Sequence, residues 1–151
     1  MHPQKGNVLV KTDICYLIEE MIVRYSSVVE EKKIILSLSC PLNTHWIVAE
    51  SATLNEVFEI LLKNMLDLSN EAEVIELSII PGDLFLTVDF LNRSRSVGAE
   101  QLHAFFTDSA NMYHTSLYKA SELAIHALAG EIMYGSSEET GTFFRLKIKE
   151  S

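Results

Sequence analysis

The stretch SATLNEVFEILLKNMLDLSNEAEVIELSIIPGDLFLTVDFL, residues 51–91, decides the fold class. In its first part, apolar residues recur every three or four positions, which predicts a helix with one buried stripe. In its second part, the strand-forming runs 74–80 and 84–91 flank Pro81, Gly82 and Asp83, whose turn chemistry predicts an antiparallel hairpin. An amphipathic helix followed by a hairpin indicates a sheet covered by helices.

The helix in this stretch is predicted to begin near Ser51, where Thr53 and Glu56 have the spacing of a capping box. Upstream, residues 7–11 are predicted to be extended. A single helix then follows. Its buried stripe is expected to consist of Ile14, Leu17, Ile18, Met21, Ile22, Tyr25, Val28 and Val29.

This first helix is expected to be capped by Thr12 and Asp13 and to end in the charged run 30–33. Alternating apolar residues predict a strand over 34–40, which Pro41 stops, and a shorter extended piece over 45–49.

Downstream, a loop over 92–115 is predicted to contain a short helix, 99–106. A helix over 117–129 follows, and Gly130 is expected to close it in the left-handed conformation. Strands over 131–134 and 142–149 end the chain. The predicted fold is an α/β two-layer sandwich, in which helices cover one face of a mixed, mostly antiparallel sheet.

Composition indicates one globular domain over residues 1–151, since 48% of the residues are hydrophobic and 22% are charged. The formal charge of −9 argues against a nucleic-acid partner, and no apolar run approaches the ~20 residues that span a bilayer. Neither membrane insertion nor a secretory signal is expected. Cys15 and Cys40 are interpreted as buried free thiols rather than a disulfide, which fits a cytoplasmic location.

Several strings, in this order, carry a resemblance to a known family. They are EEKKIIL (30–36), LNEV (54–57), LLKN (61–64), GEI (130–132) and GTFF (141–144). Together they resemble the C-terminal ATPase-like domain of sensor histidine kinases in the GHKL superfamily. The resemblance covers essentially the whole chain and implies the histidine-kinase ATPase-like, or Bergerat, fold.

The resemblance also implies a nucleotide site whose residues are largely changed. Asn64 stands where the family has the asparagine that coordinates magnesium, so it is a metal ligand only if ATP binds. Ile60 occupies the place of a polar residue involved in catalysis, and isoleucine can neither accept a proton nor bind a metal. Asp67 adds a negative charge where a lysine is frequent.

The family's first glycine box has an aspartate that binds adenine, followed by two glycines. Here the matching residues are Asn92, Ser94 and Ser96. Asparagine lacks the charge of aspartate, and serine makes a positive φ costly where glycine does not. The second glycine box, at the start of the late helix, is matched by Thr115, Ser116 and Leu117. In the closing strand, Gly141 and Thr142 keep the family pattern.

These changes predict that the chain binds no cofactor, with Mg-ATP as the alternative. Arg93 and Arg95 are expected to be solvated, although two arginines can also recognise a carboxylate or a phosphate. The sequence contains no phosphoacceptor motif at any of its five histidines and no dimerising hairpin upstream of the ATPase-like region. It also contains no HExxH or Gly-x-Ser-x-Gly string that would support hydrolytic chemistry.

Three functions remain open from the sequence. The first is a non-catalytic two-component signalling module, a pseudokinase that docks a response-regulator receiver domain or a histidine-kinase dimerisation domain. The second is a weakly active ATP-binding domain of a sensor histidine kinase. The third is a switch protein like the anti-sigma factors of the same superfamily.

Overall fold

The computed structural model describes residues 9–40, 46–109 and 116–149. A five-stranded sheet has the order β2-β4-β5-β7-β6, in which only β2 and β4 pair in parallel. The strands are β2 (Ile35–Ser39), β4 (Val74–Ile80), β5 (Phe85–Asn92), β6 (Gly130–Ser137) and β7 (Gly141–Lys149). A separate ribbon pairs β1 (Val10–Asp13) antiparallel with β3 (Trp46–Ala49).

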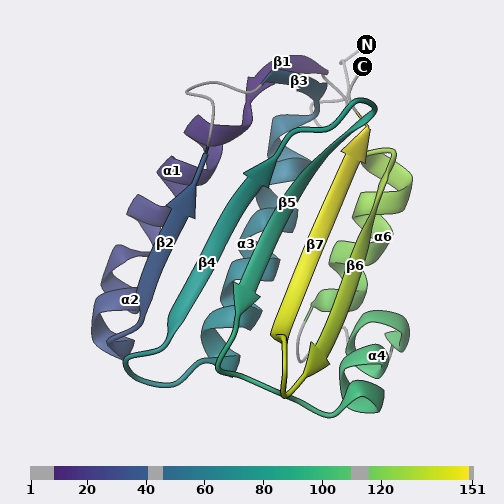
Figure 1. Cartoon of the computed structure of the whole chain (residues 1–151). Coiled ribbons are helices and arrows are strands. Elements are labelled where there is room, and N and C mark those ends of the chain that lie inside the picture. Colours follow the sequence, from purple (N-terminus) through teal and green to yellow (C-terminus); the bar gives the residue numbers. More distant parts are fainter. Residues whose placement is uncertain (1–8, 41–45, 110–115, 150–151) are drawn as a thin grey trace.

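Helices cover one face of the sheet, and in Figure 1 α1, α3 and α6 lie behind the strands. The helices are α1 (Ile14–Arg24), α2 (Ser26–Lys32), α3 (Ser51–Leu68), α4 (Ala99–Thr107) and α6 (Leu117–Ala127). This arrangement confirms the predicted two-layer sandwich and its mostly antiparallel sheet. None of the described helices combines the length and apolar character needed to cross a bilayer.

The core lies between α3 and the inward residues of β5 and β7. Alternate residues of these two strands are buried, as the pleat of a sheet with one covered face requires. Phe58 of α3 meets Phe90 of β5 with ring centroids 6.4 Å apart. Phe106 of α4 stacks on Tyr134 of β6 at 4.1 Å, which fixes α4 against the edge of the sheet. Each such side chain stabilises the fold by roughly 1.5–3 kcal/mol.

The first predicted helix is divided into α1 and α2 at Tyr25, so the prediction of one continuous helix was wrong. The Ser26 hydroxyl donates to the Val23 carbonyl at 2.8 Å, a local bond that competes with the helical ladder. The predicted cap is confirmed for Asp13, whose Oδ1 accepts from the Tyr16 amide at 3.2 Å.

The capping box predicted for α3 does not form. The helix begins at Ser51, with Glu50 as its N-cap, and the Thr53 hydroxyl donates to the Glu50 carboxylate instead. Glu56 is therefore free to reach α6, where its carboxylate contacts Lys119 Nζ at 2.7 Å. This ion pair joins the two helices at the surface.

The expectation of free thiols was also wrong, since Cys15 and Cys40 form a disulfide. Their Cα atoms lie 6.5 Å apart although 25 residues separate them in sequence, because the fold brings the start of α1 beside the end of β2. The spacing of apolar residues places Cys15 in a helix and Cys40 in a strand. It does not show that these two elements are neighbours in the fold. The expectation of a reducing, cytoplasmic location loses the support that free thiols gave it.

The end of α6 differs from its prediction as well. The left-handed residue is Ala129, with a φ of 51°, and Gly130 is the first residue of β6. A Cβ atom at position 130 would lie 2.0 Å from the Lys147 carbonyl oxygen. Glycine is therefore needed for the close approach of β6 to β7, not for the helix cap.

Candidate functional site

Part of the predicted site lies where β5 ends beside the start of β7, namely Asn92, Ser94, Ser96, Gly141 and Thr142. Asn92 pairs with Thr142 across the two strands, and Gly141 lies against the Asn92 backbone. Ser94 and Ser96 follow in the exposed loop, and Ser69, the residue after α3, contacts Asn92 from the helix layer. Thr115 lies outside the described residues.

Asn92 is fully buried, and hydrogen bonds within the protein engage both ends of its amide. Its Nδ2 donates to Ser69 Oγ at 2.7 Å and to Glu73 Oε1 at 3.0 Å. Its Oδ1 accepts from the Ser94 amide at 2.9 Å, which closes a local turn typical of asparagine. The side chain is fully buried and its Oδ1 already accepts from the Ser94 amide, so a purine amino group finds no exposed acceptor at this residue.

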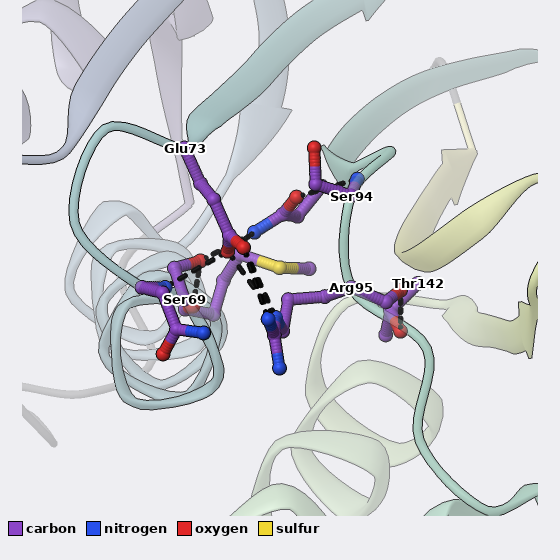
Figure 2. A network of polar contacts seen from close by, with 8 residues as sticks. Ser69, Glu73, Ser94, Arg95 and Thr142 are labelled. Carbon is purple, nitrogen blue, oxygen red and sulfur yellow. Dashed lines mark hydrogen bonds and ion pairs between the residues drawn. The ribbon is translucent and has the colours of Figure 1, made fainter.

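Glu73, which precedes β4, connects Asn92 to Arg95. Arg95 Nη2 lies 3.1 Å from Glu73 Oε2, and its Nε donates to the same carboxylate. In Figure 2 the two side chains point toward one another between the loop and the end of α3. The Glu73 side chain is 15% exposed and that of Arg95 33%, so the pair is largely shielded from water. We call Ser69, Glu73, Asn92 and Arg95 the polar plug.

The loop that carries Arg95 is attached to the strands beneath it. The Thr142 hydroxyl donates to the Arg95 carbonyl at 2.8 Å (Figure 2). The Ser136 hydroxyl lies 2.8 Å from that of Thr142. Ser136 also accepts from the Val97 amide at 2.8 Å. These bonds hold the loop against β6 and β7.

Neither serine of the glycine-box match adopts a positive φ. The described non-glycine residues with positive φ are Lys33, Ala72, Ser116 and Ala129. The loop therefore takes a backbone path that serine accommodates, not the one for which the family's glycines are needed. Ser94 and Ser96 are both exposed.

On α3, Ile60 is buried in the hydrophobic core. The Nδ2 of Asn64 donates to the Ile60 carbonyl at 2.8 Å, a bond within the helix itself. Asp67 is exposed and lies 4.0 Å from Lys32. The helix thus offers an aliphatic side chain at the place of the catalytic polar residue.

At the start of α6, Ser116 is the N-cap with a φ of 61°, and its side chain forms no capping bond. Leu117 is buried, so its side chain belongs to the core. The Leu117 side chain therefore anchors the start of α6 to the protein interior.

The expectation of solvation holds for the Arg93 side chain, which is 69% exposed although its Nε contacts Glu76 Oε2 at 2.6 Å. It was wrong for Arg95, whose side chain is 33% exposed and pairs with Glu73. Glu73 and Glu76 were not singled out from the sequence, although the hairpin register contained a signal. Glu76 pairs with Leu91, so Glu73 lies near position 94 when the register is extended three residues outward.

A pocket of about 540 Å³ opens beside the polar plug. It is lined by Glu71, Ala72, Glu73, Val74, Glu76, Arg93 and Ser94. Three of these residues are carboxylates, and the single arginine of the lining is paired with Glu76, so the lining offers no unpaired positive charge to a triphosphate. Among the described residues, no group of three or more His, Cys, Asp or Glu side chains could hold a metal ion.

Of the five histidines, His103 and His126 lie in the described part of the chain. His103 Nδ1 is 2.7 Å from the Tyr134 hydroxyl, and His126 is 3.5 Å from Glu122. The first contact joins α4 to β6, and the second lies within α6. His2, His45 and His114 lie outside the described residues.

The plug predicts a specific acid sensitivity. Burial raises the pKa of Glu73, but hydrogen bonds from the Asn70 amide, Arg95 and Asn92 outweigh it and lower that pKa below its usual value. Because this pKa is lower in the folded state, the ionised Glu73 carboxylate stabilises the fold at pH values above the ordinary carboxyl pKa. The contribution is lost as the pH falls through the folded-state pKa.

Urea unfolding over a pH series should therefore show that the stability advantage of wild type over Glu73→Gln shrinks as the pH falls. Glu71→Gln, in the same turn at an exposed carboxylate, is the control and should keep the acid dependence of the wild type. A constant difference between wild type and Glu73→Gln at every pH would contradict the prediction.

Solved structures with a similar fold include catalytic domains of histidine kinases. The catalytic domain of the histidine kinase ThkA is similar to this chain with a TM-score of 0.85 and 15% identity, over 94% of this chain and 95% of that chain. The histidine kinase AdeS of Acinetobacter baumannii is similar with a TM-score of 0.78 and 15% identity, over 95% of this chain and 68% of that chain. The fold is therefore the one found in histidine-kinase catalytic domains.

ThkA has also been solved in complex with the response regulator TrrA. That kinase chain matches with a TM-score of 0.83 and 15% identity, over 95% of this chain and 42% of the kinase chain. No protein-family model matches this sequence, and no curated protein matches it either.

Proposed function

We propose that this chain is a non-catalytic two-component signalling module, with the fold of histidine-kinase catalytic domains, that has lost ATP binding and acts by docking to proteins. The observation that carries the proposal is the polar plug. Asn92 stands at the place of the adenine-binding aspartate. Its side-chain amide nitrogen donates to Ser69 and to Glu73 inside the protein.

Two further observations support the loss of nucleotide binding. Ile60 and Leu117, which replace a catalytic polar residue and a glycine, are both buried in the core. A nucleotide would therefore have to break the ion pair between Glu73 and Arg95 and also displace packed aliphatic side chains. If each change costs about 1–3 kcal/mol, their sum removes the affinity of a micromolar site.

The docking role follows from what the fold retains. The core, the sheet and the helices are intact, while the residues expected to bind ATP are replaced. We therefore infer that the protein functions by binding other proteins through its surface. The similar kinase ThkA was solved with a response regulator, which makes a receiver domain the first partner to test and a histidine-kinase dimerisation domain the second.

Calorimetry with Mg-ATP tests the first half of this proposal. We expect no saturable heat at millimolar nucleotide and no shift of the melting temperature. A ligand at a hundredfold its Kd would stabilise the fold by about 2.7 kcal/mol, enough to move the melting temperature by several degrees. A one-to-one isotherm with a matching thermal shift would overturn the proposal.

A further inference from the structure

The face of the five-stranded sheet turned away from the helices, which we call the open face, is uncovered by any described helix (Figure 1). Its outward positions include exposed apolar side chains at Ile80, Phe85 and Met133. Apolar side chains gathered on one uncovered face are a feature of interaction surfaces.

An ordered ion pair lies on β5 and β7 of this face. Arg145 and Asp89 are directly opposite each other, with Nε to Oδ1 at 2.6 Å and Nη2 to Oδ2 at 3.0 Å. The guanidinium carbon also lies 5.1 Å from the centroid of the Phe143 ring. This bidentate pairing engages Nε and Nη2 and leaves the two N–H groups of Nη1 for another acceptor. Arg145 is therefore a preorganised donor.

Lys147 stands two positions further along β7. Its ammonium lies 4.9 Å from the centroid of the Phe85 ring, and it forms no ion pair with any residue that the structure describes. Together with Arg145 it lines a shallow pocket of about 410 Å³. The remaining lining residues are Ile80, Thr87 and Met133. The nearest carboxylates lie outside this lining: Asp89 pairs with Arg145, and Glu131 is the register partner of Lys147 on β6.

We propose that the open face is a docking surface for an acidic, partly apolar segment of a partner protein, whose carboxylate binds between Arg145 and Lys147. The side chains of Ile80 and Met133 pack against the apolar neighbours of that carboxylate. This inference names the surface behind the docking role and rests on the proposed function.

Charge complementarity selects this occupant. The protein carries a formal charge of −9, whereas this pocket is lined by two cations. Lys147 forms no ion pair among the described residues, and Arg145 keeps the N–H groups of Nη1 for a second carboxylate beside Asp89. A nucleic acid needs repeated phosphate contacts along an extended basic surface, which a single pair of cations does not provide. A single carboxylate flanked by apolar side chains is complementary to the two cations of the pocket and to its apolar residues Ile80 and Met133.

The test uses a short fluorescein-labelled peptide of glutamate and leucine, with two variants in which lysine replaces glutamate or serine replaces leucine. Anisotropy should show saturable binding of the first peptide alone. Lys147→Glu should weaken it about tenfold or more. Lys63→Glu is the matched control, because it makes the same charge change at an exposed lysine of α3, and its affinity should stay near wild type. Thermal melting confirms that both variants fold.

Three results would overturn the inference: no binding at millimolar peptide, equal weakening by Lys147→Glu and Lys63→Glu, or equal binding of the serine peptide together with competition by inorganic phosphate. The last result would identify a general anion site. Mg-ATP calorimetry on the same samples separates the two proposals. If Mg-ATP binds while the peptide still depends on Lys147, the nucleotide proposal fails and the docking surface stands.

Discussion

Asn92→Asp, the substitution that restores the family's aspartate, should destabilise this protein by about 3 kcal/mol. The wild-type amide donates to Glu73 Oε1 at 3.0 Å from a fully buried position. An aspartate there is acceptor-only, so it would lose this bond and place a second carboxylate beside the first. Urea unfolding measures the loss.

A double-mutant cycle with Glu73→Gln identifies the cause. A glutamine at position 73 supplies an N–H donor to the aspartate introduced at position 92, so the double variant should recover much of the loss, with a coupling energy of about 2 kcal/mol. Asn55→Asp is the matched control, because Asn55 Oδ1 accepts from Arg24 Nη2 at 3.0 Å and a carboxylate is the better acceptor there. A stable Asn92→Asp variant without coupling to position 73 would show that the plug does not depend on the amide.

Gly141→Ala should destabilise the protein by about 3 kcal/mol or more. Gly141 has a φ of 81°, which L-residues rarely adopt. An added Cβ would also lie 2.3 Å from the Asn92 carbonyl oxygen and 2.4 Å from Arg93 Cα. Both atoms are backbone, so no side-chain rotation relieves the clash.

Gly98→Ala is the control for this prediction. A Cβ at position 98 meets its nearest neighbour, Gln101 Cβ, at 3.8 Å, and its φ is −59°. Alanine should therefore cost no more than about 1 kcal/mol there, mainly through the weaker helix cap. Chemical denaturation compares the free energies of unfolding of the two variants directly. Similar destabilisation at both positions would contradict the prediction that backbone contacts at Gly141 exclude a Cβ atom.

Much of the fold was predictable because each element carries its own pattern. The stripe from Leu54 to Met65 predicted α3, and the turn at Pro81 predicted the hairpin of β4 and β5, both of which the structure confirms. The errors arose where a single contact overrides the pattern. The Ser26 hydroxyl bonds to the Val23 carbonyl where the first predicted helix divides. Gly130 permits the close approach of β6 to β7 and does not end α6.

The short strings singled out Asn92 and Thr142 separately, and the structure pairs them where β5 ends beside the start of β7. The hydrogen bonds that connect these residues to others could not be predicted. The strings did not reveal Glu73, which stands 19 residues from Asn92 in a turn without a motif of its own. The disulfide between Cys15 and Cys40 was missed for the same reason, since both depend on which elements meet in space.

The carboxylate of Glu73 also imposes an order on any series of single substitutions that introduces an aspartate at position 92. We expect such an aspartate to be tolerated only after position 73 has lost its charge, yet that first step leaves Arg95 without its carboxylate partner. The first variant of the series is therefore expected to be less stable than the wild type, whichever position changes first. The buried hydrogen bond makes each of the two residues depend on the identity of the other.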